Sequence, residues 1–271
     1  MRKISGMSLY LSLSFEDISL GHLFLFPSCL WDRRIEMTTK VEKQTKFTDQ
    51  LVEEILPIWR ANHSHPFVQG IGHGTLAEEK FRHYLVQDYL YLKQYTKVFA
   101  VGIQKANDLD IMTTLSESVH GLLSVEMSLH RKYAERFGLT EDEFTYAKEA
   151  PTTIAYTRYM LSEAQNGTLA HVVAAVLPCA WSYLEIGKEL AQIPGALDHP
   201  LYGDWVKMYS SEEFTKSAQD MIDLMDQLAS NLAGEELDHL KEIFLQTTRF
   251  EYLFWEMGNE LKDWPEAIQA K

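Results

Sequence analysis

From Lys43 to the end of the chain, apolar residues recur three and four positions apart, which is the spacing of one face of a helix. The first such stretch places Phe47, Leu51, Ile55 and Trp59 on a single face. No stretch shows the two-residue alternation of a half-buried strand. This pattern predicts an all-α protein, built as a single bundle of helices joined by short polar loops.

Glycines, prolines and capping residues divide this pattern into eight expected helices. They run over about 44–62, from Thr75 to about 106, over about 108–137, from Pro151 to Gly167, over 169–193, over a short stretch opened by 199–205, from Ser210 onward, and from Gly234 to just before Pro265. Residues 63–76 are expected to form a loop between the first two helices.

The composition excludes several classes of protein. The chain has 271 residues, 46% of them hydrophobic, so it can bury a sizeable core. Its net charge of −14 argues against nucleic acid as a partner, because binding to phosphates needs clustered Lys and Arg. We find no run of about 18 apolar residues, so no membrane-spanning helix is expected.

Residues 1–36 differ from the rest of the chain. They hold four basic and four acidic residues, and neither a helical nor a strand period extends over them. We interpret them as a non-native or disordered extension, with Met37 as the natural start and 37–271 as the folded domain. Of the two cysteines, Cys29 lies in this extension, which leaves Cys179 alone in the domain. A disulfide framework is therefore excluded, and a cytoplasmic location is expected.

Three helices carry a carboxylate or a thiol on the face that should be apolar. Asp88 falls among apolar residues in the second helix, Glu251 near the centre of the apolar face of the last, and Cys179 on that of the fifth. Each alone has a structural explanation: a buried acid with a hydrogen-bond partner, or a cysteine used as a small apolar residue. Together, with tyrosines beside each, they predict a polar pocket for a flat, nitrogen-rich ligand.

A metal site is the competing interpretation, because 117–120 and 236–239 both match the Glu-x-x-His pattern of di-iron bundles. At about 100° per residue, the first match and the histidine of the second turn away from the apolar faces of their helices. The inward pair in the third helix is instead Glu126 with His130, four positions apart. One such pair is typical of a buried hydrogen-bonded couple rather than of a metal site.

Five segments of the chain together resemble a known family. They are HPFVQGIGHGTL (65–76), QDYLYL (87–92), VLPCAWSYLEIG (176–187), HPLYGDW (199–205) and FEYLFWEM (250–257). In this order they resemble the TenA, or thiaminase II, family of aminopyrimidine aminohydrolases, and the resemblance extends over about 45–264. It implies a heme-oxygenase-like helical fold without heme, assembled as a homotetramer.

The resemblance also implies an activity. It is the hydrolysis of 4-amino-5-aminomethyl-2-methylpyrimidine to the 5-hydroxymethyl compound in thiamine salvage, with release of ammonia. Many members also cleave thiamine, and neither a metal nor an organic cofactor takes part. Whether the aminomethyl pyrimidine, its formylated precursor or thiamine is preferred stays open.

The same resemblance assigns roles to residues. Cys179 matches the nucleophile, Glu251 the residue that protonates the pyrimidine ring, and Asp88 the carboxylate that binds the amidine-like edge of the substrate. Four tyrosines match the substrate pocket: Tyr91, which stacks on the ring, Tyr156, Tyr183 and Tyr209. The chain departs from the family in having Ala180 after the cysteine, where an aromatic residue is common, and this affects the walls of the pocket rather than a named role.

Two alternatives remain open from the sequence. A di-iron oxidase on the same fold would use Glu126, His130 and Asp88 among its ligands, although the sequence lacks a second inward histidine. A non-catalytic regulatory protein that binds pyrimidines would show binding without turnover, and it would have no use for the thiol of Cys179.

Overall fold

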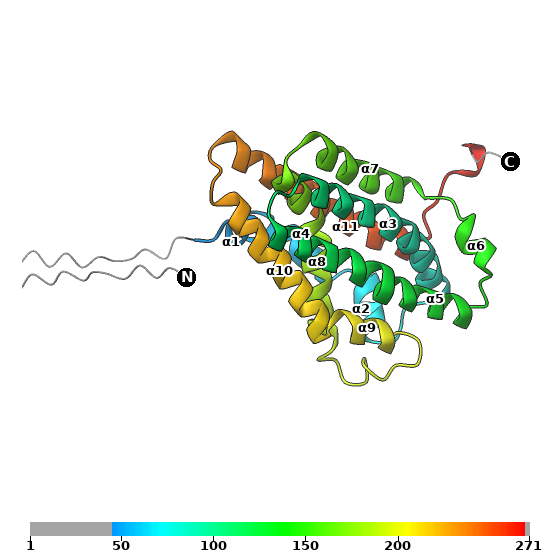
Figure 1. Ribbon diagram of the computed structural model, residues 1–271. Coiled ribbons are helices and arrows are strands. Elements are labelled where there is room, and N and C mark those ends of the chain that lie inside the picture. The colour runs from blue at the N-terminus through cyan, green and yellow to red at the C-terminus, as the bar shows by residue number, and fades with distance from the viewer. Residues whose placement is uncertain (1–44, 269–271) are drawn as a thin grey trace, which may run out of the picture. The chain divides into compact units, whose positions relative to one another are not determined.

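The computed structural model of the protein describes residues 45–268, and all regular structure in this range is helical (Figure 1). The bounds of the α-helices are α1 Phe47–His63, α2 Pro66–Gly72, α3 Glu78–Lys105, α4 Leu109–Gly121, α5 Met127–Arg136, α6 Glu141–Thr145, α7 Pro151–Asn166, α8 Leu169–Leu190, α9 Gly203–Tyr209, α10 Glu212–Ala229 and α11 Glu235–Glu260. A π-helical turn, η1, spans Leu122–Glu126 between α4 and α5, and a 3₁₀ turn spans Glu266–Ile268. The predicted all-α architecture is confirmed.

The helices described belong to one compact unit, 44–271. The interpretation of residues 1–36 as an extension, with Met37 as the natural start, lies outside the described residues. So does Cys29. The boundary between extension and domain therefore stays a prediction.

Helix α8 is the one around which the others pack, since it contacts α3, α7, α9, α10 and α11. Its first half is almost uniformly apolar, as expected of a helix enclosed by others, and residues 172–177 are fully buried. Contrary to the expectation from sequence, α8 is long and apolar enough to cross a membrane, with a mean hydropathy of 1.5 over 18 residues. Because 67% of that window is buried inside the protein, its composition is that of a core helix.

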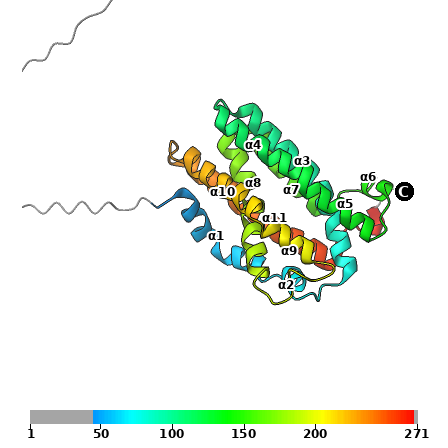
Figure 2. The ribbon, with the colours of Figure 1, turned by 60° about the horizontal axis from the view of Figure 1, so that its bottom comes forward.

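The π-helical turn η1 interrupts what the sequence predicts as one regular helix over 108–137. Helix α3 packs against α4 and α7, and Figure 2 shows these three running side by side. A π-helical turn holds more residues than an α-helical one, so it changes the face that the following residues present. Glu126 is the last residue of η1, and its carboxylate accepts a hydrogen bond from Tyr209 of α9 at 2.7 Å.

The expectation of a loop over residues 63–76 is wrong in part, because α2 lies within it. Pro66 occupies the first turn of α2, where its missing N–H costs no hydrogen bond. The ring of His65 then accepts a hydrogen bond from the N–H of Phe67 at 3.1 Å and caps the helix. Such a short helix gives too few residues for its apolar period to be read from the sequence.

Helices α8 and α9 approach so closely that their contact requires a glycine. A Cβ atom added to Gly187 would lie 2.5 Å from the carbonyl carbon of Tyr209 and 2.6 Å from its carbonyl oxygen. We expect Gly187→Ala to lower the free energy of unfolding by about 1–3 kcal/mol and to displace Tyr209, because backbone atoms cannot move aside as a flexible side chain can.

Urea unfolding of Gly187→Ala measures this loss, and Gly121→Ala is its matched control. A Cβ atom on Gly121 would meet nothing within 4 Å, and alanine is the better helix former, so the control should lose no stability. An equal loss in both variants would show that the close approach of α8 and α9 is not the cause.

Candidate active site

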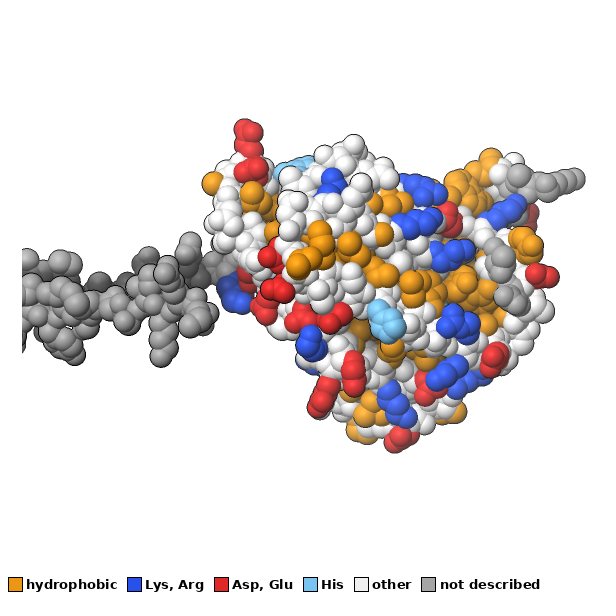
Figure 3. All heavy atoms as spheres, in the orientation of Figure 1, with side chains coloured by type: hydrophobic (Ala, Val, Ile, Leu, Met, Phe, Trp, Pro, Cys, Tyr) orange, Lys and Arg blue, Asp and Glu red, His pale blue; other side chains and the backbone are white. Residues whose placement is uncertain are grey.

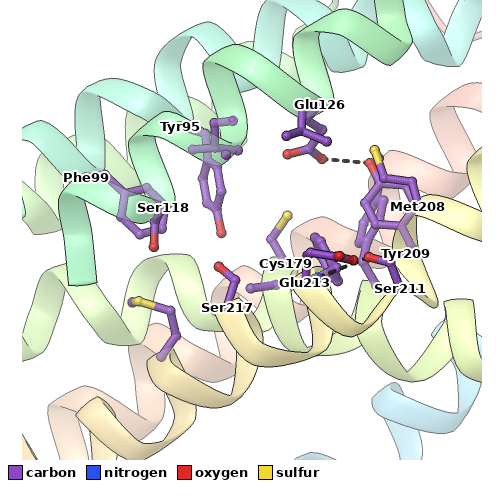
Figure 4. A pocket seen from close by; sticks show the side chains of 17 residues that line it. Tyr95, Phe99, Ser118, Glu126, Cys179, Met208, Tyr209, Ser211, Glu213 and Ser217 are labelled. Carbon is purple, nitrogen blue, oxygen red and sulfur yellow. Dashed lines mark hydrogen bonds between the residues drawn. The ribbon is translucent and has the colours of Figure 1, made fainter. Parts of the chain in front are cut away.

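A cavity of about 150 Å³ lies between α3, α4 with η1, α8, α9 and α10 (Figure 4). Tyr95 of α3, Glu126 of η1, Cys179 and Tyr183 of α8, and Tyr209 of α9 line it. Three residues predicted for the site, Cys179, Tyr183 and Tyr209, therefore meet around one space. Sites for drug-sized ligands have volumes of about 300–1,000 Å³, so this cavity suits a small, single-ring ligand.

Helix α8 directs the thiol of Cys179 into the cavity (Figure 4). The preceding Pro178 is buried inside the helix and has no N–H to donate to the previous turn. In the same turn, the carbonyl of Val176 accepts a hydrogen bond from Tyr95 Oη at 2.8 Å. This bond joins α3 to α8 beside the thiol and holds Tyr95 in the cavity wall.

The thiol of Cys179 is neutral at rest. Burial raises the pKa of Cys179 well above its usual range, and the neighbouring carboxyl group of Glu251 raises it further. A hydrogen bond with Tyr91 lowers this pKa without cancelling the rise. Because the thiolate is the nucleophilic form, the thiol needs a proton acceptor at the moment it reacts.

Glu251 of α11 is only 2% exposed, and it contacts two other predicted site residues. Tyr156 Oη of α7 donates a hydrogen bond to its Oε1 at 2.5 Å, and Cys179 is near enough for the thiol and the carboxyl group each to shift the pKa of the other. Burial raises the pKa of Glu251 to about 8, in spite of the opposing hydrogen bonds. At neutral pH, Glu251 therefore holds a proton directly beside the thiol, as an acid catalyst must.

Glu251, Tyr156 and Tyr91 do not themselves line the cavity. The rings of Tyr91 and Tyr156 lie 5.0 Å apart, and Tyr91 and Glu251 both act on the pKa of Cys179. These three predicted residues form a buried group that reaches the cavity through Cys179.

Asp88 of α3 is also buried, and it pairs with His130 of α5 instead of lining the cavity. His130 Nε2 lies 2.8 Å from Asp88 Oδ2, and His130 Nδ1 lies 2.9 Å from the backbone carbonyl of Glu126. A carbonyl can only accept, so Nδ1 carries a proton. Burial alone would lower the pKa of His130, but the hydrogen bond to Asp88 and its charge outweigh burial and raise it. The fold therefore favours the charged form of His130 beside Asp88.

The same geometry disfavours the di-iron alternative. Both ring nitrogens of His130 are engaged, so the ring offers no lone pair to a metal. Within residues 45–268, no group of three or more His, Cys, Asp or Glu side chains has the arrangement of a metal site. In the two Glu-x-x-His matches, Glu117, His120 and His239 are exposed, as their position on the helices predicts.

We expect Asp88→Asn to destabilise the fold by about 3–5 kcal/mol, because it leaves a buried imidazolium without its counter-charge. The pKa of His130 is raised in the fold, so its charged form contributes stability at low pH that is lost as the pH rises through the folded-state pKa. The loss in the variant should therefore be larger at pH 6 than at pH 9, as measured by urea unfolding.

Asp204→Asn is the control for this charge removal. Asp204 pairs with Arg136 at 3.1 Å, and the two side chains are 46% and 38% exposed, so the expected cost is at most about 1 kcal/mol. A loss of similar size in both variants would contradict an imidazolium at His130.

Glu126 is the cavity residue that sequence reasoning did not assign to the substrate site. Its carboxylate lines the cavity and accepts the hydrogen bond from Tyr209. Burial, together with the charge of Asp88, raises the pKa of Glu126 to about 7, while Tyr209 and His130 act in the opposite direction. The inward spacing of Glu126 and His130 was the signal in the sequence, but it was interpreted only as a metal site or a buried pair.

Aromatic rings make up much of the remaining wall. The rings of Tyr183 and Tyr209 lie 4.7 Å apart at an angle of 63°. Behind them, the hydroxyl groups of Tyr183 and Tyr84 are 3.1 Å apart, and Trp205 Nε1 donates to Tyr84 Oη at 3.3 Å. These bonds fix the orientation of the rings, so a flat ligand would meet a rigid aromatic surface.

Comparison with known proteins now identifies the family. Residues 52–260 match the model of the TENA/THI-4/PQQC family. The chain belongs to this family. The resemblance to TenA proteins that the five sequence segments predict is confirmed.

Individual TenA-family relatives agree with the match. An aminopyrimidine aminohydrolase of Halalkalibacterium halodurans is 49% identical over 218 residues, which are 80% of this chain and 97% of the relative. The solved structure of a TenA family transcription regulator from Silicibacter sp. TM1040 is 32% identical, with a TM-score of 0.74 over 79% of this chain and 96% of that one.

The heme-oxygenase-like fold expected for a TenA protein is also confirmed. A protein of Shewanella denitrificans with a heme oxygenase-like fold superimposes with a TM-score of 0.63 over 79% of this chain and 92% of its own. It is 14% identical, so this likeness concerns the fold alone.

Proposed function

We propose that this chain is an aminopyrimidine aminohydrolase in which Cys179 is the nucleophile and Glu251 the acid. The enzyme class is that of the relative at 49% identity, which aligns over nearly its whole length. The observation that carries the catalytic roles is the contact between the two groups. A thiol facing the cavity lies beside a buried carboxyl group whose pKa is raised to about 8, and each of the two groups shifts the pKa of the other.

The proposed substrate is 4-amino-5-aminomethyl-2-methylpyrimidine, which fits the size of the cavity and its aromatic wall. A pyrimidine resists nucleophilic attack until a ring nitrogen is protonated, and Glu251 holds the proton for this step. As Glu251 gives its proton to the ring, it accepts the proton of the Cys179 thiol, and the sulfur bonds to ring carbon C6.

Addition of sulfur breaks the aromaticity of the ring and activates the exocyclic methylene. The carbon–nitrogen bond of the protonated amine breaks with its electron pair on nitrogen, and neutral ammonia leaves. Water then bonds to the methylene carbon and loses one proton, which ammonia takes up in solution. The sulfur–carbon bond breaks last: Glu251 returns the thiol proton to Cys179 and takes back the proton that it gave to the ring nitrogen, so both groups return to their resting state. Every proton in these reaction steps is held by the chain, the substrate or water, so neither a metal nor an organic cofactor is required.

The substrate-binding roles proposed for Asp88 and the four tyrosines have different support. Tyr183 and Tyr209 line the cavity, which supports direct contact with the ring. Tyr91 and Tyr156 contact Cys179 and Glu251, which supports a role in orienting the reacting groups. Asp88 pairs with His130, so its proposed contact with the substrate would require it to accept a second partner.

Hydrolysis of the aminomethyl pyrimidine by the purified protein tests the proposal, with thiamine and the formylated precursor assayed in parallel. Release of ammonia together with the hydroxymethyl pyrimidine supports the aminohydrolase, and the ratio of the rates identifies the preferred substrate. Tight binding of the pyrimidine without turnover would instead favour the regulatory binding protein.

A homotetramer in the cytoplasm, with no nucleic acid or membrane as partner, completes the proposal. Leu109, Leu123 and Val125 on α4 and η1 are 77%, 50% and 58% exposed. Figure 3 shows hydrophobic side chains at the surface in the region of α4 and the turn η1 that follows it, and such exposure supports a contact between subunits there. The free thiol of Cys179 supports a reducing compartment.

A further inference from the structure

The cavity beside Cys179 is acidic. Among the described residues that line it, the charged side chains are Glu126 and Glu213, and none is a Lys, Arg or His. Glu213, in the first turn of α10, is exposed, so solvent screens its charge. Glu126 is partly buried in the cavity wall. Less water therefore lies between its charge and a bound ligand, and the charge is screened less than that of Glu213.

The carboxylate of Glu126 has room for one more partner. Its Oε1 accepts the hydrogen bond from Tyr209 Oη at 2.7 Å, and Oε2 has no hydrogen bond within residues 45–268. Figure 4 shows the side chains of Glu126 and Cys179 pointing into the same space from opposite helices. A ring attacked by the thiol would therefore present its substituents to Glu126.

We propose that Glu126 is a specificity-determining residue, whose carboxylate binds the ammonium form of the aminomethyl substituent and so selects pyrimidines that carry a positive charge at this position. This inference rests on the aminohydrolase function proposed above. It differs from the contact that the sequence resemblance gave to Asp88, which is with the amidine-like edge of the substrate.

The chemistry of the substituent agrees with this assignment. An alkyl ammonium group is a donor of several hydrogen bonds, and those to a carboxylate are about twice as strong as neutral ones. A positive charge close to Glu126 also favours its ionised form, against the burial that raises its pKa to about 7. The ammonium group leaves as neutral ammonia, because the carbon–nitrogen electron pair stays on nitrogen. The attraction to Glu126 is then lost, and the neutral hydroxymethyl product binds more weakly than the substrate.

The test compares two ligands of nearly equal shape, the aminomethyl and the hydroxymethyl pyrimidine, by calorimetry at pH 7. Cys179→Ala serves as the background, so that the amine is bound without being hydrolysed. This background protein should bind the amine more tightly than the alcohol. Adding Glu126→Gln should weaken binding of the amine by roughly 10- to 100-fold, the range for a hydrogen bond to a charged group. It should weaken binding of the alcohol by less than about threefold.

Glu117→Gln in the same background is the matched control, because Glu117 is an exposed glutamate of α4 outside the cavity. Both affinities should stay the same. Equal weakening of both ligands by Glu126→Gln, or no change in either, would overturn the inference. If Glu126→Gln fails to fold, equal affinity of the background protein for amine and alcohol overturns it without that variant. Failure to bind either pyrimidine would instead refute the aminohydrolase itself.

Discussion

Replacing Cys179 with alanine is expected to reduce turnover of the aminomethyl pyrimidine by at least about 10⁴-fold, because no other group in the cavity can form the bond to ring carbon C6. The other polar groups of the wall are weaker nucleophiles than a thiolate: tyrosine hydroxyls whose pKa values burial raises well above their usual range, serine hydroxyls and carboxylates. Ammonia release, followed with formation of the hydroxymethyl pyrimidine, measures the loss.

Two controls separate chemistry from folding in Cys179→Ala. The variant removes one small, partly exposed side chain, so its melting temperature should stay close to that of the unmodified protein. It should also still bind the pyrimidine. Turnover above one-tenth of the original rate in a folded variant would exclude Cys179 as the nucleophile.

Replacing Glu251 with glutamine is expected to lower kcat/KM by about 10²- to 10⁴-fold, the usual contribution of an acid–base catalyst. In the unmodified protein, kcat/KM should fall as the pH rises through about 8, because Glu251 then loses the proton that the ring needs. This decline should be absent from the residual activity of Glu251→Gln. A decline at the same pH in the variant would assign the titration to another group.

The same substitution should stabilise the protein at high pH. The pKa of Glu251 rises from 4.5 to about 8 on folding, so between these values the unfolded chain releases a proton that the folded chain keeps. Stability of the unmodified protein therefore falls as the pH rises across this window, by up to a few kcal/mol. Glutamine mimics the neutral acid and does not titrate. Glu251→Gln should match the unmodified protein at pH 4, below this window, and exceed its free energy of unfolding at pH 8.

Glu256→Gln provides a control on the same helix with the opposite sign. Hydrogen bonds to Lys262 and His65 lower the pKa of Glu256, so its ionised form is the stabilising one. Replacing Glu256 should not raise the free energy of unfolding at pH 8. A gain there in both variants would indicate a general effect of removing negative charge from an acidic protein, and not the burial of Glu251.

The helical period predicted the fold well, because most of the helices span several turns and bury one face. Asp88, Cys179 and Glu251 were predicted as site residues for the same reason: a polar group on an apolar face is visible in the spacing alone. The spacing does not specify the partner of such a group. Asp88 faces His130, and that pairing depends on how α3 packs against α5.

The π-helical turn shows where the spacing fails. Arithmetic at about 100° per residue assumes a regular helix, and η1 adds residues to one turn. Its local sequence, LLSVE, contains no proline or glycine that would signal the change. The assignment of Glu126 to the cavity wall therefore needs the tertiary structure, and in particular Tyr209 on a helix more than 80 residues away in sequence.

The neutral state of Cys179 has a consequence for the lifetime of the enzyme. Peroxides and alkylating reagents attack thiolates and react slowly with thiols. A cysteine that burial and neighbouring acids keep protonated is thus shielded from both until a ring with a basic nitrogen arrives and accepts a proton. Chemical resistance in the resting state and nucleophilicity in the occupied state then have the same origin, and a selective inhibitor would be a pyrimidine rather than a general thiol reagent.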